Sequence, residues 1–307
     1  MSVVSRLAIL LMKWGNRHSR FGAQVCNTPD LIKPQNEQIS IATKRAFDDG
    51  HSFFQRFDGT FHAQDLTAKD VLDIGSGCGG RTAYYFLHGN PRSIVGLDIS
   101  TLRASIAQRS VKQLCGDSRI CFVVGVGEDL PFQDASFDFL LSYDVFEHVE
   151  NLYQVLQECY RVLRPRGTLC ALFPPYYGPR AHHLDYITTL PFLHHLFSPS
   201  VLVQAANRIL QEQPSLRDCP LPNPERSYLG REVLPRLNGT TWRDFRRIVE
   251  DLPFEVEQMT LVPFGWGEGG IAKRIVHMFC KALLTLPLPF QQDLFASTMR
   301  CILRKRE

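Results

Sequence analysis

The sequence predicts an α/β protein built on a doubly wound, mostly parallel sheet. Short apolar runs alternate with amphipathic helical patterns between Asp70 and Pro174, and the first apolar run ends in a cluster of glycines. The chain has 307 residues, of which 44% are hydrophobic, enough to bury a sizeable core. Strand–helix alternation is typical of a parallel sheet with helices on both faces, in which ligands bind at the carboxyl ends of the strands.

The first two strand–helix units follow from the local pattern. "KDVLDIG" is a short buried strand that runs into a tight turn, and "GRTAYYFLHGNP" is a helix that ends at Gly89 and Pro91. "RSIVGLDIS" is a second buried strand. Ser100 is placed to cap the helix that follows it.

Three further strands and one helix complete the alternation. The strands are "RICFVVGV", "SFDFLLSYDV" and "GTLCALFPP". Between the last two lies a strongly amphipathic helix, whose apolar face consists of Leu152, Val155, Leu156, Cys159, Val162 and Leu163.

The turn after the first strand, "VLDIGSGCGGRT", matches two nucleotide-binding patterns. Gly75, Gly77 and Gly79 form G-x-G-x-G, which is typical of S-adenosylmethionine sites. Gly75, Gly77 and Gly80 form the G-x-G-x-x-G of NAD or FAD sites. The glycines alone do not distinguish the two cofactors.

Two acidic residues lie near these glycines, and one of them favours S-adenosylmethionine. Asp98 ends the second strand, where a carboxylate can accept both ribose hydroxyls of either cofactor. Asp73 lies two residues before the first glycine. A carboxylate there would repel a pyrophosphate, whereas it favours the ammonium and sulfonium groups of S-adenosylmethionine.

The ordered segments "VLDIGSGCGG", "IVGLDIS", "VGVGEDLPFQDASFDFLLSYDVFEHV" and "ECYRVLRPRGTLCALFP" resemble the class I S-adenosylmethionine-dependent methyltransferases, in the small-molecule (type 11-like) branch. The resemblance covers about Asp70 to Pro174, over a third of the chain. It implies a seven-stranded sheet with an antiparallel last strand. "FEVEQMTLVPF" and "LFASTMRCILRKR" resemble the final two strands.

The resemblance also implies the residues on the methionine side of the cofactor. Four of them lie around the first turn: Asp73, Gly75, Ser76 and Gly77. Ser142 and Tyr143, after the fourth strand, would close the sulfonium side.

On the nucleoside side, the resemblance implies that Asp98 binds the ribose hydroxyls and that Ile99 packs on the adenine. Three residues before "LPF" would border the adenine edge: Gly127, Glu128 and Asp129. Family members commonly have an acid and a small residue before this segment, where this chain has Val126 and Gly127. Glu128 or Asp129 is therefore the candidate partner of the adenine amine.

Histidines are the candidate general bases. Methyl transfer requires in-line alignment and exclusion of water, and a hydroxyl acceptor also benefits from a base with a histidine-like pKa. The candidates are His148, with Glu147 beside it, after the fourth strand, and His182 or His183 after the fifth. Glu147 and His148 alternatively brace the site without catalytic roles. His194 and His195 are predicted to pack.

The predicted domains are an N-terminal helical cap at 1–60 and a methyltransferase domain at 61–307. Within the latter, 175–238 is an insertion before the sixth strand. Its aromatic residues and prolines favour a substrate lid over a flat or apolar small-molecule acceptor.

The composition and the local sequence pattern bear on the partners and the location of the protein. A net charge of +3 and the absence of long basic runs argue against nucleic acid, although "FPPYYGP" resembles a signature of amino-methylating nucleic-acid enzymes. Scattered cysteines without metal-like spacing predict no metal and reduced thiols in a cytoplasmic protein. The N-terminal segment has three interpretations, namely an amphipathic helix that packs on the domain, a transit peptide, or a helix that makes a weak membrane-surface contact. The helix at 271–284 is interpreted either as a solvated outer helix or as a second membrane-surface contact. The oligomeric state is left open.

The function predicted from these observations is S-adenosylmethionine-dependent methylation of a small, fairly apolar or aromatic acceptor, at oxygen, with a histidine base. Carbon or nitrogen methylation of a quinone, sterol or alkaloid-like acceptor is an alternative within the same class. A nicotinamide-dependent oxidoreductase is an alternative from another enzyme class. A cofactor-binding partner without catalytic activity is the non-enzyme alternative.

Overall fold

The computed structural model describes most of the chain, namely residues 2–16, 41–185, 187–213, 232–265, 271–285 and 292–307. The chain forms two compact units from discontinuous segments. We call the first the sheet unit, made of Asp30–Phe173, Arg246–Thr260 and Arg300–Glu307. We call the second the insertion unit, made of Met1–Pro29, Pro174–Phe245 and Leu261–Met299.

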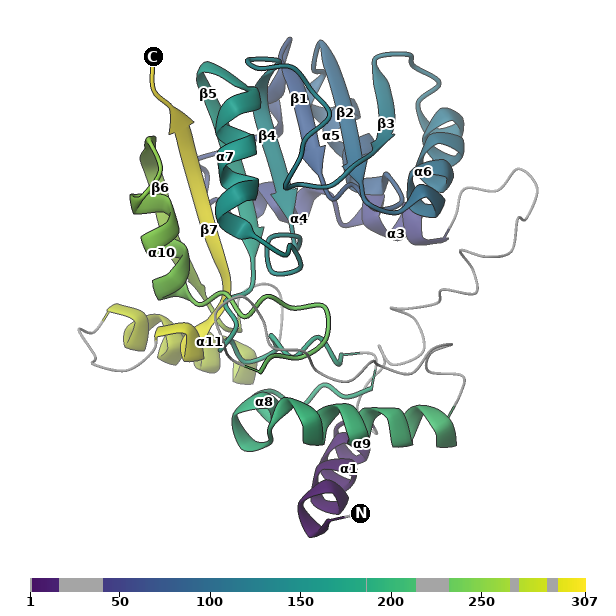
Figure 1. Cartoon of the computed structure of the whole chain (residues 1–307), viewed down its shortest axis with the longest axis vertical. Helices are drawn as coiled ribbons and strands as arrows, with labels where there is room; N and C mark the ends of the chain where they lie inside the picture. The colour runs from purple at the N-terminus through teal and green to yellow at the C-terminus, as the bar shows by residue number, and fades with distance from the viewer. Residues whose placement is uncertain (1, 17–40, 186, 214–231, 266–270, 286–291) are drawn as a thin grey trace. The chain divides into compact units, whose positions relative to one another are not determined.

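A seven-stranded sheet has the order β3-β2-β1-β4-β5-β7-β6 (Figure 1). Its strands are β1 Asp70–Ile74, β2 Ser93–Asp98, β3 Ile120–Val124, β4 Phe137–Tyr143, β5 Leu163–Phe173, β6 Phe254–Pro263 and β7 Ala296–Lys305. The first five strands pair in parallel, and β7 points in the opposite direction to β4 (Figure 1). The predicted seven-stranded, mostly parallel sheet is confirmed.

The register brings the ends of three strands together. Ile74, the last residue of β1, lies between Leu97 of β2 and Ser142 of β4. The chain leaves β1 toward β2 on one side and returns to β4 on the other, so the strand order reverses at β1. A crevice at the carboxyl ends of strands flanking such a reversal is the usual ligand site of open α/β sheets.

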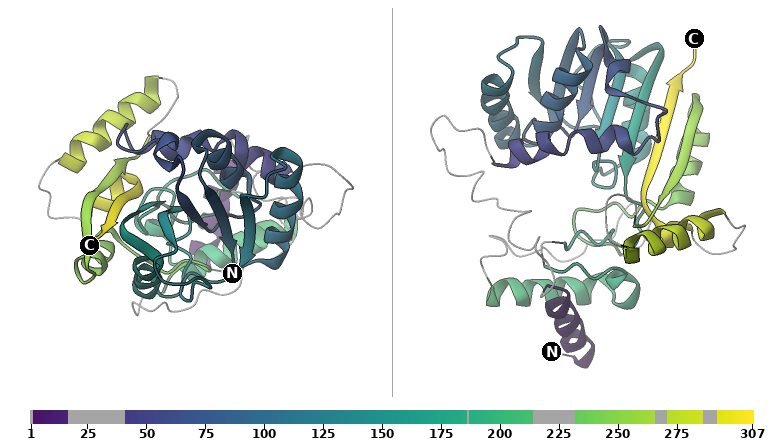
Figure 2. Two further views of the ribbon diagram at one scale, coloured as in Figure 1. Left: turned by 90° about the horizontal axis from the view of Figure 1, so that it is seen from above. Right: turned by 180° about the vertical axis from the view of Figure 1, so that it is seen from behind.

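Helices cover both faces of the sheet, as predicted. Figures 1 and 2 show α7 (Leu152–Val162) on one face and α4 (His51–Gln55) with α5 (Gly80–Gly89) on the other. Single residues next to the helices determine where two of them begin or end. The Ser100 side chain accepts from the backbone N–H of Arg103 and so caps α6 (Thr101–Leu114), as the sequence predicts. Asn90 adopts a left-handed conformation and ends α5.

An aromatic cluster forms the core between α4, α5 and the sheet. Phe53, Phe57 and Tyr85 are fully buried there, and their rings make edge-on and tilted contacts with one another and with neighbouring aromatic rings. This core fixes α5, and therefore the glycine-rich turn that leads into it, against the sheet.

The insertion unit has its own apolar core, in which α1 (Val3–Asn16) packs on α9 (Pro199–Glu212). Ala8 and Met12 of α1 are fully buried in it. The unit also contains α8 (Leu193–Leu196), the start of α10 (Trp242–Glu250) and α11 (Ile271–Thr285). Since α3 (Ile41–Asp48) and α4 belong to the sheet unit, the helices of the predicted 1–60 cap are divided between the two units.

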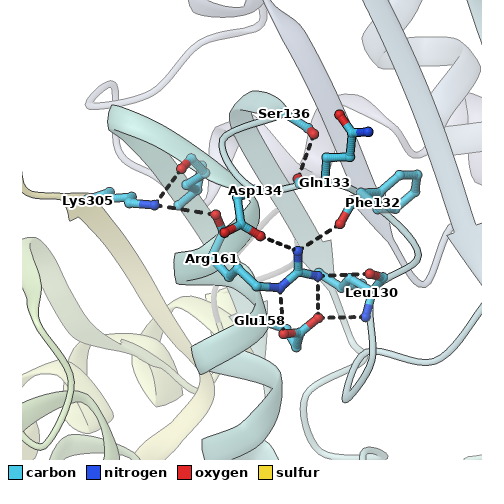
Figure 3. Close-up of polar contacts among 9 residues, drawn as sticks. Leu130, Phe132, Gln133, Asp134, Ser136, Glu158, Arg161 and Lys305 are labelled. Carbon is cyan, nitrogen blue, oxygen red and sulfur yellow. Dashed lines mark hydrogen bonds and ion pairs between the residues drawn. The ribbon is translucent and has the colours of Figure 1, made fainter.

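Arg161 of α7 holds the segment that joins β3 to β4 (Figure 3). Its guanidinium donates to the carbonyls of Leu130 (2.9 Å) and Phe132 (2.8 Å), and to the carboxylates of Glu158 and Asp134. Glu158 in turn accepts from the Leu130 backbone N–H at 2.8 Å. The network therefore anchors the chain immediately after the predicted adenine-contacting residues 127–129.

The Arg161→Ala variant is expected to lower the free energy of unfolding by about 2 kcal/mol, because two carbonyls and a partly buried carboxylate lose charged donors. Urea denaturation measures the change. Asp134→Ala is the matched control, since its side chain is 78% exposed and its loss should cost at most about 0.5 kcal/mol. Equal losses in both variants would contradict the anchoring role.

Candidate cofactor site and active site

The glycine-rich turn after β1 is tied to the end of β2. The backbone N–H groups of Gly75 and Ser76 both donate to the carbonyl of Leu97, at 2.7 and 2.9 Å. A β-carbon at Gly75 would lie 2.1 Å from a methyl of Val145, so no larger residue fits there. A β-carbon at Gly77 would meet nothing within 4 Å, although the φ of +56° still favours glycine. The turn thus has open space beside Gly77.

Asp98 fixes this turn from the end of β2. One carboxylate oxygen accepts from the Gly77 backbone N–H at 2.9 Å, and the other accepts from Ser100 N–H at 2.8 Å. A carboxylate has about four acceptor positions, so two remain for ribose hydroxyls. Asp98 therefore lies where the sequence predicts it and has a structural role that the sequence analysis missed.

Asp73 is a buried carboxylate beside the turn. The hydroxyl of Thr82, in the first turn of α5, donates to it at 2.6 Å. Burial raises the pKa of Asp73 to about 7, although the Thr82 hydrogen bond and the nearby Arg81 oppose the rise. A cationic ligand would bind favourably beside this buried carboxyl group, because its positive charge would stabilise the ionised form.

Two further features of the turn indicate what kind of ligand fits. Among the described residues, the buried Ser76 hydroxyl has no hydrogen-bond partner. The apolar side chain of Ile99, directly after β2, is 72% exposed. A ligand with a cationic group for Asp73, polar atoms for Ser76 and Asp98, and a flat apolar part for Ile99 would satisfy all four. S-adenosylmethionine has these parts.

Ser142 and Tyr143 end β4 next to β1. Ser142 is buried between Ile74 and Ala171. The Arg81 guanidinium lies 4.1 Å from the centre of the Tyr143 ring, in cation–π geometry. This contact holds the Tyr143 ring in place, and closure of the sulfonium side by the two residues stays a prediction.

The segment at Gly127, Glu128 and Asp129 is bound to the start of α7. The Glu128 carboxylate accepts from the backbone N–H groups of Glu150 and Asn151, at 2.8 and 3.2 Å. This position suits an acid, because a helix N-terminus carries a partial positive charge. Asp129 instead has an exposed side chain. Of the two predicted partners for the adenine amine, the structure leaves the carboxylate of Asp129 more accessible.

Glu147 and His148 follow β4 in the sheet unit. Glu147 is buried, and burial together with the nearby Asp144 raises the pKa of its carboxyl well above the usual range. The His148 side chain is 39% exposed, and its Nε2 lies 3.7 Å from a Glu147 carboxyl oxygen. An accessible imidazole beside a buried carboxyl group is a suitable arrangement for accepting a proton.

His182 and His183 belong to the insertion unit. His182 is buried: its Nδ1 accepts from the Leu184 N–H at 3.0 Å, while its Nε2 lies 2.9 Å from the Leu190 carbonyl and donates to it in this tautomer. Burial lowers the pKa of His182, which favours this neutral form. Both ring nitrogens are thus engaged by the backbone, which favours a structural role. His183 is half-buried in a left-handed conformation.

The predicted packing agrees with the surroundings of His194, whereas His195 is exposed. The His194 ring lies 6.0 Å from that of Tyr176, and burial lowers its pKa to about 3. The Nε2 of His195 lies 2.9 Å from the Tyr177 carbonyl.

Thr43 of α3 and Thr82 of α5 support the site without having been found in the sequence. The buried Thr43 hydroxyl donates to the Cys78 carbonyl at 2.8 Å, and so α3 holds the glycine-rich turn from outside the motif. No local pattern marks Thr43. The sequence gives a weak indication of the role of Thr82, because this polar residue lies on the buried side of the helix that follows the glycines.

Residues of the sheet unit are similar to a known family of domains. Residues 72–171 match the family model described as "Methyltransferase domain", Methyltransf_11. These residues are a class I S-adenosylmethionine-dependent methyltransferase domain. Its cofactor is S-adenosylmethionine, and the nicotinamide alternative is not supported.

Known proteins with similar methyltransferase domains include two curated relatives. Phthiotriol/phenolphthiotriol dimycocerosates methyltransferase 1 from Mycobacterium ulcerans is 36% identical over 105 residues, which are 34% of this chain and 37% of that protein. Demethylmenaquinone methyltransferase from Thermotoga maritima is 31% identical over 139 residues, covering 44% of this chain and 58% of that protein. The similarity thus spans little more than a third of the first relative and under two thirds of the second.

A solved structure with the same fold is that of a protein assigned as an S-adenosylmethionine-dependent methyltransferase from Listeria monocytogenes. It superposes with a TM-score of 0.52 at 14% identity, covering 84% of this chain and 99% of that one. At this identity the likeness concerns the fold alone.

Within the described residues, no helix combines the length and the apolar character needed to cross a bilayer. The cytoplasmic location expected from the cysteines stays a prediction.

Proposed function

We propose that the protein transfers a methyl group from S-adenosylmethionine to an oxygen of a small, fairly apolar or aromatic acceptor, with His148 as general base. The observation that carries this proposal is the methyltransferase domain whose turn combines a buried Asp73 with Asp98 and an exposed Ile99. His148 follows β4, the strand that pairs with β1 on the side opposite β2.

The residues of the turn would hold the cofactor by charge and shape. Asp73 would bind the ammonium group, Ser76 would donate to a polar atom of the methionine part, and Asp98 would accept from the ribose hydroxyls. Ile99 would cover one face of the adenine. When bound, S-adenosylmethionine supplies a methyl group that is already activated for transfer. The protein therefore needs to align the acceptor and exclude water.

His148 would accept the proton of the acceptor hydroxyl. Its imidazole is partly exposed, whereas both nitrogens of His182 bond to the backbone. Glu147 would orient the imidazole from its buried position. His183 remains the second candidate, and its part in the reaction stays a prediction.

The apolar character of the acceptor is supported by the relatives. They act on dimycocerosate lipids and on a quinone precursor, demethylmenaquinone. The predicted lid, 175–238, contains Tyr177, which is half-buried, and Tyr176, which is buried in the core of the insertion unit. Tyr186 lies outside the described residues. Carbon or nitrogen methylation of a quinone-like acceptor is the second candidate, favoured by the same relatives.

Product analysis tests this proposal. The purified full chain is incubated with S-adenosylmethionine and, separately, with an apolar phenol, a demethylated quinone and an apolar amine. We expect a gain of one methyl group on the phenol oxygen. Transfer to a ring carbon or to nitrogen alone would replace the oxygen assignment. Cofactor binding without any transfer to these acceptors would favour a non-catalytic partner.

Cofactor affinity is expected to depend on pH through Asp73. Its folded pKa, about 7, lies above the ordinary value, so the unliganded native state binds this proton more tightly than the unfolded chain. Stability without ligand should therefore fall as pH rises from about 4 to about 7. A cationic ligand favours the ionised form, so its affinity should increase over the same rise, by up to about tenfold per pH unit.

Calorimetry with S-adenosylhomocysteine at several pH values measures this linkage, and Asp73→Asn is the matched control. The variant keeps the size of the side chain and cannot release the proton. Its affinity should be weaker and nearly independent of pH between about 5 and 7. An equally steep pH dependence in the variant would assign the titration to another group.

A further inference from the structure

Helix α1 has two apolar sides, and within the part of the chain that the structure describes only one of them packs against another element. Ala8 and Met12 are fully buried against α9. On the other side Val3, Leu7 and Leu10 follow one another at helical spacing and are exposed, Leu7 by 50% and Leu10 by 65%. Aliphatic side chains in such a stripe are unusual on a surface that contacts only water.

The charges on α1 are all positive. The helix contains Arg6 and Lys13 and no Asp or Glu. Lys13 forms an ion pair with Glu212 of α9, which keeps the two helices together, whereas Arg6 is exposed on the first turns. A cation beside an apolar stripe, without any acidic residue, complements a negatively charged apolar boundary.

Helix α11 of the same unit repeats this pattern. Ile275, Met278 and Phe279 are exposed, and Cys280 is buried on the other side. The helix also has cations and no acidic residue; Arg274 and Lys281 are exposed. The exposed large apolar side chains of α11 lie within residues 275–279, whereas Leu283 and Leu284 are half-buried.

We propose that the insertion unit binds the surface of an anionic lipid bilayer through the exposed stripe of α1, with α11 as a second contact. The apolar side chains would enter the headgroup boundary, and the cations would bind lipid phosphates. An anionic bilayer accounts both for the exposed apolar side chains and for the presence of cations without acidic residues on these two helices. A groove on another protein would account for the apolar side chains, but it would not require that every charge on the helices be positive. The proposal goes beyond methyl transfer, since it concerns binding that requires neither cofactor nor acceptor.

Vesicle co-sedimentation of the full chain tests the proposal. The probes are vesicles of phosphatidylcholine mixed with phosphatidylglycerol, and vesicles of phosphatidylcholine alone. We expect binding to the mixed vesicles that weakens at high salt, and much weaker binding to the neutral ones. The double variant Leu7→Glu/Leu10→Glu should bind the mixed vesicles at least about tenfold more weakly, because two apolar contacts are lost and two negative charges are added.

Leu87→Glu is the matched control for this double variant. Leu87 is 49% exposed, close to Leu7, but lies on α5 of the sheet unit, and its replacement should leave vesicle binding unchanged. Thermal unfolding confirms that the variants remain folded, which is expected because Leu7 and Leu10 lie away from the α9 contact. Ile275→Glu/Phe279→Glu should also weaken binding to the mixed vesicles. If this variant bound them as well as wild type, α11 would not be part of the contact.

Three results would overturn the assignment of α1. The first is that the wild-type chain does not bind the mixed vesicles, and the second is that Leu7→Glu/Leu10→Glu binds them as well as wild type. The third is a concentration-dependent dimer in size-exclusion chromatography that disappears in the same variant. That result would assign the stripe to a second copy of the chain.

Discussion

The His148→Ala variant is expected to lower kcat about 10²–10⁴-fold for an acceptor with a weakly acidic hydroxyl, because a general base typically contributes that factor. His148 is the candidate with an accessible imidazole in the methyltransferase domain, next to the buried Glu147. The loss should shrink for acceptors whose hydroxyl ionises readily, since an anionic oxygen needs no base. Initial rates with a series of phenols of different acidity measure this trend.

Two control variants separate catalysis from folding. His88→Ala changes an exposed histidine on α5 and should keep kcat within about threefold of wild type. His182→Ala breaks two backbone hydrogen bonds, so it should mainly lower the free energy of unfolding, by about 1–3 kcal/mol. If His148→Ala lost less than about threefold with every phenol, alignment alone would account for the rate. The carbon or nitrogen alternative would then become the leading one.

The Asp98→Ala variant is expected to weaken S-adenosylhomocysteine binding by about 1.5–3 kcal/mol, or roughly 10- to 150-fold. The change removes the predicted acceptor of the ribose hydroxyls. It also removes the acceptor of the Gly77 and Ser100 N–H groups, so the glycine-rich turn is no longer linked through this carboxylate to the start of α6. Calorimetry measures the affinity, and circular dichroism confirms the fold.

Asp98→Asn and Asp129→Ala are comparison variants, and both are expected to weaken cofactor binding less than Asp98→Ala. The amide of Asn keeps one acceptor oxygen, so binding should be intermediate. Asp129→Ala removes an exposed carboxylate at the predicted adenine edge and should weaken binding less than Asp98→Ala. Unchanged affinity in a folded Asp98→Ala protein would contradict the assignment of the β2 end.

The sheet could be predicted because its signals are local. Each of the first five strands is a short apolar run bounded by glycines, prolines or a helix cap, and Ser100 caps α6 as expected. Asp73 and Asp98 were found because they end neighbouring strands next to the glycines. The last two strands were predicted from the family resemblance.

Contacts between segments far apart in the sequence could not be predicted in this way. Thr43 reaches the carbonyl of Cys78, 35 positions away, and nothing near Thr43 marks it as part of the site. The Glu128 carboxylate bonds to the start of α7, 22 positions away, although spacing alone made it a candidate for the adenine. For α1, helical periodicity identified an apolar helix without showing which of its sides packs on α9.

The central claim is that the turn between β1 and α5 binds S-adenosylmethionine through Asp73 and Asp98. Calorimetric titration of the full chain with S-adenosylhomocysteine, and separately with NADH, tests it most directly. We predict saturable binding of S-adenosylhomocysteine that weakens strongly in Asp98→Ala, and no binding of NADH, because the buried Asp73 disfavours a pyrophosphate at this turn. Saturable binding of NADH that Asp98→Ala weakens, with no binding of S-adenosylhomocysteine, would contradict the claim.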